Sequence, residues 1–387
     1  MKEIIHIERL RILNLQALLL FFSIIVLLSV SSSYAAVKNY DIRDQIGIAV
    51  SWTDNLSHAR ENSQGKYMNE DYLSSMKTYG EPFTYVDVMN VEALVTMNYD
   101  GKKIQDLTDD DMIDFYTKRL SHIQEMLDDN SRITYTQKEK EQIMESAGQL
   151  SSLPMDYAEG WKVLNEDMGK FMPILLIITA IILLPLFGNE PQTKMTELYR
   201  STRYGKKILD RARIITAFTV GIILYLFGII LYFLIKMAPF GLWGGSQLIQ
   251  SSVATIFSVY NITYLWQFLI NAVIGLLAML FMISLTLLLT VLTDGVLTGA
   301  VGIAFFWILL LIFEQVPLYL VDHYFANFMP LKMTDFQHYY IGNEIYRILG
   351  NSITSLKWVV FLTTIISFGM ITSTIIFCNI KLRKGLS

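Results

Sequence analysis

The residues best placed to make specific contacts in this chain are cations concentrated in one short segment. The stretch Thr193–Ile214, "TKMTELYRSTRYGKKILDRARI", lies between two strongly apolar blocks and has seven basic residues against two acidic ones. The basic residues are Lys194, Arg200, Arg203, Lys206, Lys207, Arg211 and Arg213. Met195, Leu198 and Tyr199 share one helical face, so this face can fill an apolar cleft while arginines pair with carboxylates around it. A positively charged loop that only fixes topology is the other interpretation.

Nucleotide chemistry is not indicated on this chain. The four Gly-Lys pairs begin at Gly65, Gly101, Gly169 and Gly205, and none is followed by the Ser or Thr that would hold magnesium in an ATP-binding loop. We therefore expect no ATP, magnesium or other cofactor on this chain, no enzymatic activity of its own and no nucleic-acid partner.

Metal chemistry is also weakly supported by the sequence. The carboxylates of Asp109–Asp111 could be read as a cation site, but they lack the ligand spacing of a calcium loop and suit a helix N-terminus. His58 and His122 are isolated from each other, and we expect ordinary surface or core roles for both. Cys378 is the single cysteine, so no disulfide can form within the chain.

Composition indicates a membrane protein. Of the 387 residues, 53% are hydrophobic and 17% are charged, with a mean hydropathy of +0.40. Crossing a hydrocarbon core of about 30 Å takes roughly 20 helical residues without unpaired charge. Six windows qualify: 12–34, 171–187, 214–235, 265–292, 295–313 and 358–380. Their lack of Asp, Glu, Lys, Arg and His argues against a proton-driven or sodium-driven transporter.

We therefore predict a polytopic α-helical membrane protein with six transmembrane helices and a mixed α/β extracytoplasmic domain between the first two. The predicted transmembrane helices are 12–37, 169–188, 214–236, 265–293, 295–313 and 357–380. Around them we expect an interfacial helix at 1–11, the extracytoplasmic domain at 38–168, the basic segment at 189–213, outer loops at 237–264 and 314–356, and a tail at 381–387. The first outer loop is rich in Gly and polar residues and could dip into the membrane, and the second should contain short helices.

Lysine and arginine in the short loops indicate the orientation. They precede the first span, fill the basic segment and follow the sixth span, so both termini should be cytoplasmic. The first span could instead be a secretory signal, because Ser33 and Ala35 offer small residues after an apolar core. Cleavage there would leave the remaining topology unchanged.

The segment 38–168 has the composition of a small domain that can fold on its own. Thr108 should cap a helix running to Asp128, with an apolar stripe that includes Ile113 and Ile123, and Thr136 should start a second helix with Glu139 completing a capping box. Asp100-Gly101 predicts a hairpin turn. Trp161 should anchor the second span at the lipid headgroups.

Several of these motifs resemble the transmembrane subunit of a type 2 ABC exporter, the permease group of bacterial bacitracin and lantibiotic export and immunity systems. The motifs are "IERLRI" before the first span, "YAEGW" before the second, and "FGNEPQTKMTELYRSTRYGKKILDRARI" between the second and third. In that family a Glu after the second span precedes an amphipathic coupling helix, a Ser-Thr-x-x-Gly turn and a basic residue. The matching positions here are Glu190, Met195 to Ser201, Ser201 to Lys206, and then Arg211, where the family usually has Lys.

The resemblance implies a permease that pairs with an identical or sister permease and binds two cytoplasmic ABC ATPase subunits, which hold the ATP and magnesium. It places the ATPase interface on Glu190, Met195, Glu197, Leu198, Tyr199, Arg200, Ser201, Arg203, Tyr204 and Gly205. From the residues themselves, Gly205 allows a left-handed exit from this helix, and uncharged spans rich in Met and aromatic residues favour an amphipathic cargo such as a peptide antibiotic or a lipid. A membrane sensor with an extracytoplasmic ligand-binding domain is the alternative.

Overall fold

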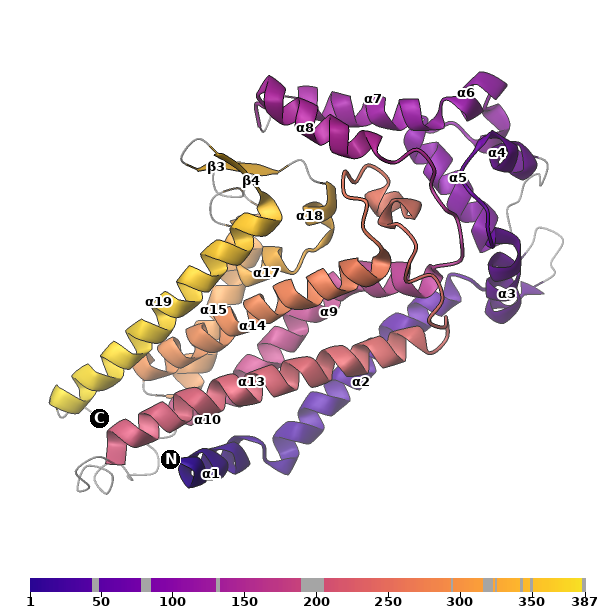
Figure 1. Cartoon of the computed structure of the whole chain (residues 1–387). Helices are drawn as coiled ribbons and strands as arrows, with labels where there is room; N and C mark the ends of the chain where they lie inside the picture. Colours follow the sequence, from indigo (N-terminus) through magenta and orange to yellow (C-terminus); the bar gives the residue numbers. More distant parts are fainter. Residues whose placement is uncertain are drawn as a thin grey trace.

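The protein is mostly helical in the computed structural model (Figure 1). The structure describes the chain except for residues 44–48, 78–84, 130–132, 189–204, 294, 316–322, 324–325, 342–343, 349–350 and 385–387. Six of its helical segments are long and apolar enough to cross a membrane, which confirms the predicted number of spans. They are α2 (Leu15–Lys38), α9 (Glu159–Leu183) continued by α10 (Pro185–Gly188), α13 (Gly205–Met237), α14 (Tyr264–Thr293), α15 (Val296–Glu314) and α19 (Ser355–Lys384).

Helix α9 forms the centre of this bundle. In its most apolar window 72% of the residues are buried, against 17% in α2 and 22% in α15 and α19, so the latter three helices line the outside. Helices α13 and α14 flank α9 and share its core, where Leu175, Tyr225 and Met279 are almost completely buried. α9 thus contacts most of the bundle and runs its full length (Figure 1).

Both chain termini lie at one end of the bundle, which we call the terminal end (Figure 1). Helix α1 (Lys2–Ile12) packs there against α13 and is separated from α2 by Asn14, whose side chain caps α2 by accepting from Ala17 N–H. Gly188 approaches the start of α15 so closely that a Cβ would lie 2.6 Å from Val296 N. Helix α14 ends at Thr293 and α15 begins at Val296, so few residues connect these two helices.

A layer of helices covers the opposite end, which we call the domain end (Figure 1). It consists of α3 (Trp52–Ser63), α4 (Glu70–Lys77), α5 (Val86–Asn98), η1 (Ile104–Asp106), α6 (Asp109–Ile113), α7 (Phe115–Asp128) and α8 (Gln137–Gly148). The predicted capping box of Thr136 and Glu139 opens α8, and the predicted cap Thr108 forms a capping box with Asp111 at the start of α6. The predicted helix from Thr108 is broken at Asp114, and Ile113 is 61% exposed, so it does not belong to the buried stripe.

The predicted hairpin at Asp100-Gly101 is wrong. Residues Val86–Asn98 form helix α5 with Tyr99 as its C-cap, and Asp100 and Gly101 follow with positive φ values of 53° and 93°. Asp-Gly supplies this backbone geometry equally well at a helix end and in a hairpin turn. Here it follows a helix, because the preceding residues are buried as helix α5. Among the described residues of this layer, strand structure is limited to the antiparallel pair β1 (Ile42–Arg43) and β2 (Ala49–Val50), so the layer is helical where a mixed α/β domain was expected.

The loop between α13 and α14 packs against the helical layer. It contains η2 (Ile249–Ser251) and η3 (Val253–Thr255), and Ile256 is buried in the core of the layer. Gly244 has a φ of 83° and lies so close to the chain before α9 that a Cβ would be 2.1 Å from Tyr157 O. This part of the chain, expected as a loop that could dip into the membrane, completes the helical layer instead.

The region before α19 also contacts the helical layer. It contains η4 (Ala326–Phe328), α17 (Pro330–Met333), α18 (Gln337–Ile341) and the hairpin of β3 (Ile345–Ile348) and β4 (Asn351–Thr354). Arg347 of the hairpin pairs with Glu139 of α8 at 2.7 Å. Because β4 leads directly into α19, the layer is tied to the last spanning helix as well as to α9.

Candidate functional site

The richest polar cluster lies where α9 leaves the helical layer and enters the bundle. Its first turns carry Glu159, Lys162, Asn165, Glu166 and Asp167, so polar groups recur every three or four residues on adjacent faces. A carboxylate in the first turn suits the positive end of the helix dipole. We call this cluster and its partners the polar junction.

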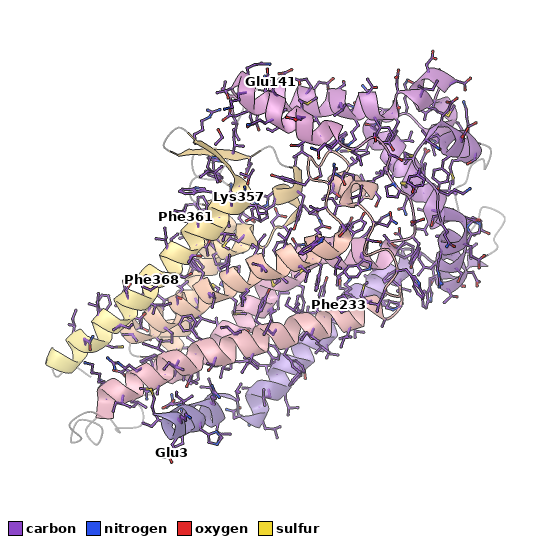
Figure 2. The ribbon with its side chains drawn as sticks, viewed as in Figure 1. Glu3, Glu141, Phe233, Lys357, Phe361 and Phe368 are labelled. Carbon is purple, nitrogen blue, oxygen red and sulfur yellow. The ribbon has the colours of Figure 1, made fainter. Side chains whose placement is uncertain are left out.

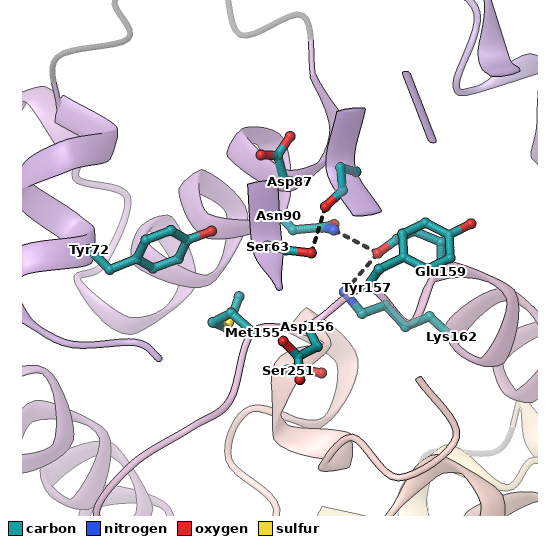
Figure 3. Close-up of a pocket in the computed structure, with 11 residues that line it drawn as sticks. Ser63, Tyr72, Asp87, Asn90, Met155, Asp156, Tyr157, Glu159, Lys162 and Ser251 are labelled. Carbon is teal, nitrogen blue, oxygen red and sulfur yellow. Dashed lines mark hydrogen bonds and ion pairs between the residues drawn. The ribbon is translucent and has the colours of Figure 1, made fainter. Parts of the chain in front are cut away.

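Glu159 is the centre of the polar junction and is 4% exposed. Its carboxylate accepts a hydrogen bond from Asn90 Nδ2 at 2.8 Å and pairs with Lys162 Nζ at 3.0 Å (Figure 3). It also accepts a hydrogen bond from Tyr40 Oη at 2.9 Å. Burial, together with the neighbouring Glu159 charge, raises the pKa of Tyr40, so its hydroxyl stays protonated and donates. One carboxylate therefore joins α9 to α5 and to the chain just after α2.

A small cavity lies beside Glu159 (Figure 3). Its volume of about 10 Å³ suits a single water molecule and excludes a cargo molecule. The lining residues are Ala59, Ser63, Tyr72, Asp87, Asn90, Met155, Asp156, Tyr157, Glu159, Lys162 and Ser251. Asp87 is buried with its Oδ1 at 3.5 Å from His58 Nδ1, and neither carboxylate oxygen receives a hydrogen bond from the described residues. The described chain contains no cluster of three metal-ligating side chains.

The next turns of α9 bind the rest of the bundle. Asn165 Oδ1 accepts from Asn271 of α14 at 3.2 Å, and the Oδ1 of Asn271 accepts from Tyr340 of α18 at 2.5 Å. Glu166 accepts from Ser252 of the loop at 2.8 Å. One residue further, Asp167 pairs with the buried Lys236 of α13 at 2.6 Å and accepts from Ser32 of α2.

This arrangement has no paired nucleophile and base and no open substrate cavity. What it does is hold α9 to α2, α5, α13, α14 and α18 through charged and polar contacts that are directional and shielded from water. A movement of the helical layer that displaces Asn90 or Tyr40 therefore acts directly on Glu159. The polar junction is a mechanical connection between the layer and the bundle.

The predicted ATPase interface falls almost wholly outside the described residues. Glu190, Met195, Glu197, Leu198, Tyr199, Arg200, Ser201, Arg203 and Tyr204 lie in 189–204. Gly205 is described, and it is the first residue of α13. The third span thus extends further into the basic segment than its apolar window indicates, and the predicted exit from the coupling helix lies outside the described residues.

The helices on both sides of that segment are clamped together at the terminal end. Arg11 of α1 donates to Pro185 O at 2.8 Å and to Leu186 O at 3.0 Å, which satisfies two carbonyls of α10. Arg213 of α13 is 2% exposed and lies 3.5 Å from Glu8 of α1. Helix α1 thus holds α10, which precedes the basic segment, and Arg213, which is the last residue of that segment.

Sequence reasoning missed the polar junction and misplaced Trp161. That tryptophan is 5% exposed and donates to Leu242 O at 3.1 Å, so it belongs to the core and is not a headgroup anchor. The regular spacing of charged and amide residues in "EGWKVLNED" was the available signal. A helix end in water does not need polar side chains at such regular spacing, whereas a helix end surrounded by protein needs them to bind its neighbours.

Comparison with known proteins gave no match to any family model, curated protein or solved structure.

Proposed function

We propose that this chain is the membrane-spanning permease subunit of an ATP-driven ABC exporter in a bacterial cytoplasmic membrane. The segment 189–213 docks onto a separate cytoplasmic ATPase, and an identical or sister permease completes the transporter. The cargo is amphipathic, a peptide antibiotic or a lipid-like molecule.

One observation carries the proposal: α10 ends just before the basic segment, α13 begins within it, and both of these helix ends lie at the terminal end, opposite the helical layer (Figure 1). The two attachment points of the segment are held by Arg11 and Arg213 through α1. A docking segment transmits force only if its base is rigid, because a freely hinged loop would absorb the displacement.

The path of that force follows α9. It begins in α10 at the terminal end and runs along the buried axis of the bundle to Glu159 in the polar junction. ATP-driven movement of the docking segment would therefore tilt α9 and shift the helical layer through Asn90 and Tyr40. In this way the continuous helical segment of α10 and α9 connects the ATPase to the helical layer, which faces the cell exterior.

The test is the double substitution Leu198→Asp and Tyr199→Asp. Placing two carboxylates in an apolar cleft costs several kcal/mol, so association with the ATPase should fall by roughly 100-fold or more. The variant should reach the membrane at normal levels but lose the co-purifying ATPase and its cargo-stimulated hydrolysis. Lys207→Gln is the matched control, because Lys207 is exposed in the first turn of α13 and its loss alters only the charge that favours topology.

A membrane sensor is the second candidate function. The polar junction supports it because a ligand that binds the helical layer would also move α9 through Glu159. Purification of the tagged full chain separates the two functions. A stoichiometric ABC ATPase supports the exporter. The exporter proposal would be contradicted if the chain co-purified with a signalling protein in place of an ABC ATPase and if the Leu198→Asp and Tyr199→Asp variant still bound that protein.

A further inference from the structure

A groove runs between α2 and α13 on the outside of the bundle, directly beneath the helical layer. Its volume is about 440 Å³, within the range of ligand sites. Val30, Tyr34 and Val37 line it from α2, where their spacing places them on one helical face, and Ile235 lines it from α13. The groove is open to the surroundings of the bundle, because Val30 is 49% and Tyr34 69% exposed.

The position of the groove places it at a membrane surface. Helix α2 has 24 residues and is about 36 Å long, which exceeds the hydrocarbon core by about a turn. At the same end of the bundle Trp243 and Trp266 are 52% and 60% exposed, as expected of an aromatic belt at the headgroups. The apolar part of the groove therefore faces acyl chains, and its upper end faces headgroups.

A cation marks that upper end. Lys38 is the last residue of α2, is exposed, and makes no ion pair with the described residues. Asp41 also lines the groove, with its carboxylate bound to Trp52 N–H at 2.6 Å, so the exposed ammonium group of Lys38 is the lining group that can contact a phosphate. Trp52 lines the same end of the groove from the first turn of α3. An apolar channel that ends at a lysine and a tryptophan is complementary to an anionic amphiphile.

We propose that this groove binds one acyl chain of an anionic phospholipid from the leaflet next to the helical layer, with its phosphate at Lys38. A transmembrane helix of a second copy does not fit, because a helix about 10 Å across would fill the volume with about one turn, and the helical layer closes the top. The site does not depend on an ATPase partner, so it stands apart from the exporter proposal.

The experiment uses the full chain in phosphatidylcholine nanodiscs that contain a trace of phosphatidylglycerol with a photoreactive acyl chain. After irradiation, labelled residues are mapped by mass spectrometry. Labelling should concentrate on Val30–Val37 and Ile235 and exceed that of Phe361 and Phe368, which project from the exposed side of α19 (Figure 2). The same probe with a phosphatidylcholine headgroup should label the groove more weakly.

Two matched pairs of variants separate the site from ordinary surrounding lipid. Lys38→Gln should lower groove labelling by phosphatidylglycerol roughly fivefold, whereas Lys357→Gln, at an exposed lysine in the first turn of α19, should not. Val30→Trp should fill the groove and reduce labelling, whereas Leu19→Trp, at an exposed position about three turns away from the groove on the same helix, should not.

The proposal would be overturned if the groove and α19 were labelled equally, or if groove labelling changed neither with the lipid headgroup nor in Lys38→Gln. Either result would show that the groove contacts only the surrounding bulk lipid. Crosslinks from the groove to a second copy of the chain in place of lipid would overturn it as well.

Discussion

Lys236 is completely buried, and its ammonium group lies 2.6 Å from Asp167 Oδ2. The pair joins α13 to α9, and Ser32 of α2 donates to the same carboxylate at 3.0 Å. The free-energy cost of removing two charges from water offsets much of their Coulombic attraction. The contact therefore fixes the relative position of three helices more than it stabilises the fold.

Removing one partner of this pair should be far more damaging than removing both. Asp167→Leu leaves the Lys236 ammonium buried without its carboxylate, and we expect a loss of about 3 kcal/mol in the free energy of unfolding. Asp167→Leu combined with Lys236→Met should recover most of that loss. Thermal unfolding in nanodiscs measures both.

Lys170 provides the control for this prediction. It pairs with the same carboxylate at 3.0 Å, but its side chain is 84% exposed, so Lys170→Met should change the melting temperature little. If Asp167→Leu behaves like Lys170→Met, the buried pair does not hold the helices.

Arg119 connects the helical layer to the loop between α13 and α14. It is 1% exposed and donates to Ile256 O at 2.7 Å, Ser258 O at 2.5 Å and Ala147 O at 3.1 Å. Arg119→Met would keep the apolar stem and leave these carbonyls unpaired, at about 1–3 kcal/mol for each one that stays buried. Hydrogen exchange across 249–260 should accelerate, whereas exchange across α14 should not.

The same contacts predict how the layer behaves by itself. The segment 38–167 lacks Ile256 and the other loop residues that complete its core. We therefore expect this segment to show no cooperative thermal transition, in contrast to the independent folding that its composition suggests. A sharp transition would show that the loop is dispensable.

The six spans were predictable because a long uncharged apolar run has few other uses in a protein. The caps at Thr108 and Thr136 were predictable because their partners are three residues away. The hairpin prediction was wrong because Asp100-Gly101 indicates positive φ values but does not indicate whether a helix or a strand comes before them. Trp161 failed because its burial depends on Phe233 and Phe268, which are distant in sequence.

The polar junction could be predicted only in part. The Glu159–Lys162 pair is visible as an i, i+3 spacing on a helix. Its other partners, Asn90 and Tyr40, are 69 and 119 residues away from Glu159, and no local pattern selects them. Such contacts arise when helices pack, so they follow from the fold and not from the segment that carries the charge.

The contact between α8 and the β3–β4 hairpin should depend on acid pH. The Arg347 guanidinium holds the pKa of Glu139 at about 2, with further hydrogen bonds from Ser352 and Thr136. A carboxylate with a lowered pKa stabilises the fold above its unfolded pKa of about 4.5, and this contribution is lost as pH falls toward 2. Hydrogen exchange of β3 and β4 should therefore accelerate between these values.

Glu139→Gln tests that assignment. The variant should exchange faster in the hairpin at neutral pH, because the charge-assisted bonds to Arg347 are lost, and its exchange should show little further change with acid beyond the intrinsic pH dependence. Glu141→Gln, on the exposed side of the same helix, should keep the parent's pH dependence. Identical acid profiles for Glu139→Gln and the parent would assign the transition to another group.

The proposed orientation can be tested with two exposed residues at opposite ends of the molecule. Glu141 lies on α8 in the helical layer, and Glu3 lies on α1 at the terminal end (Figure 2). In a Cys378→Ser background, Glu141→Cys should react with a membrane-impermeant maleimide in intact cells, and Glu3→Cys should react only after the cells are opened. The expectation rests on the lysines and arginines at the terminal end, which favour the cytoplasmic side. Reversed labelling would place the segment 189–213 outside the cell, where no ATPase could reach it, and would remove the basis of the exporter proposal.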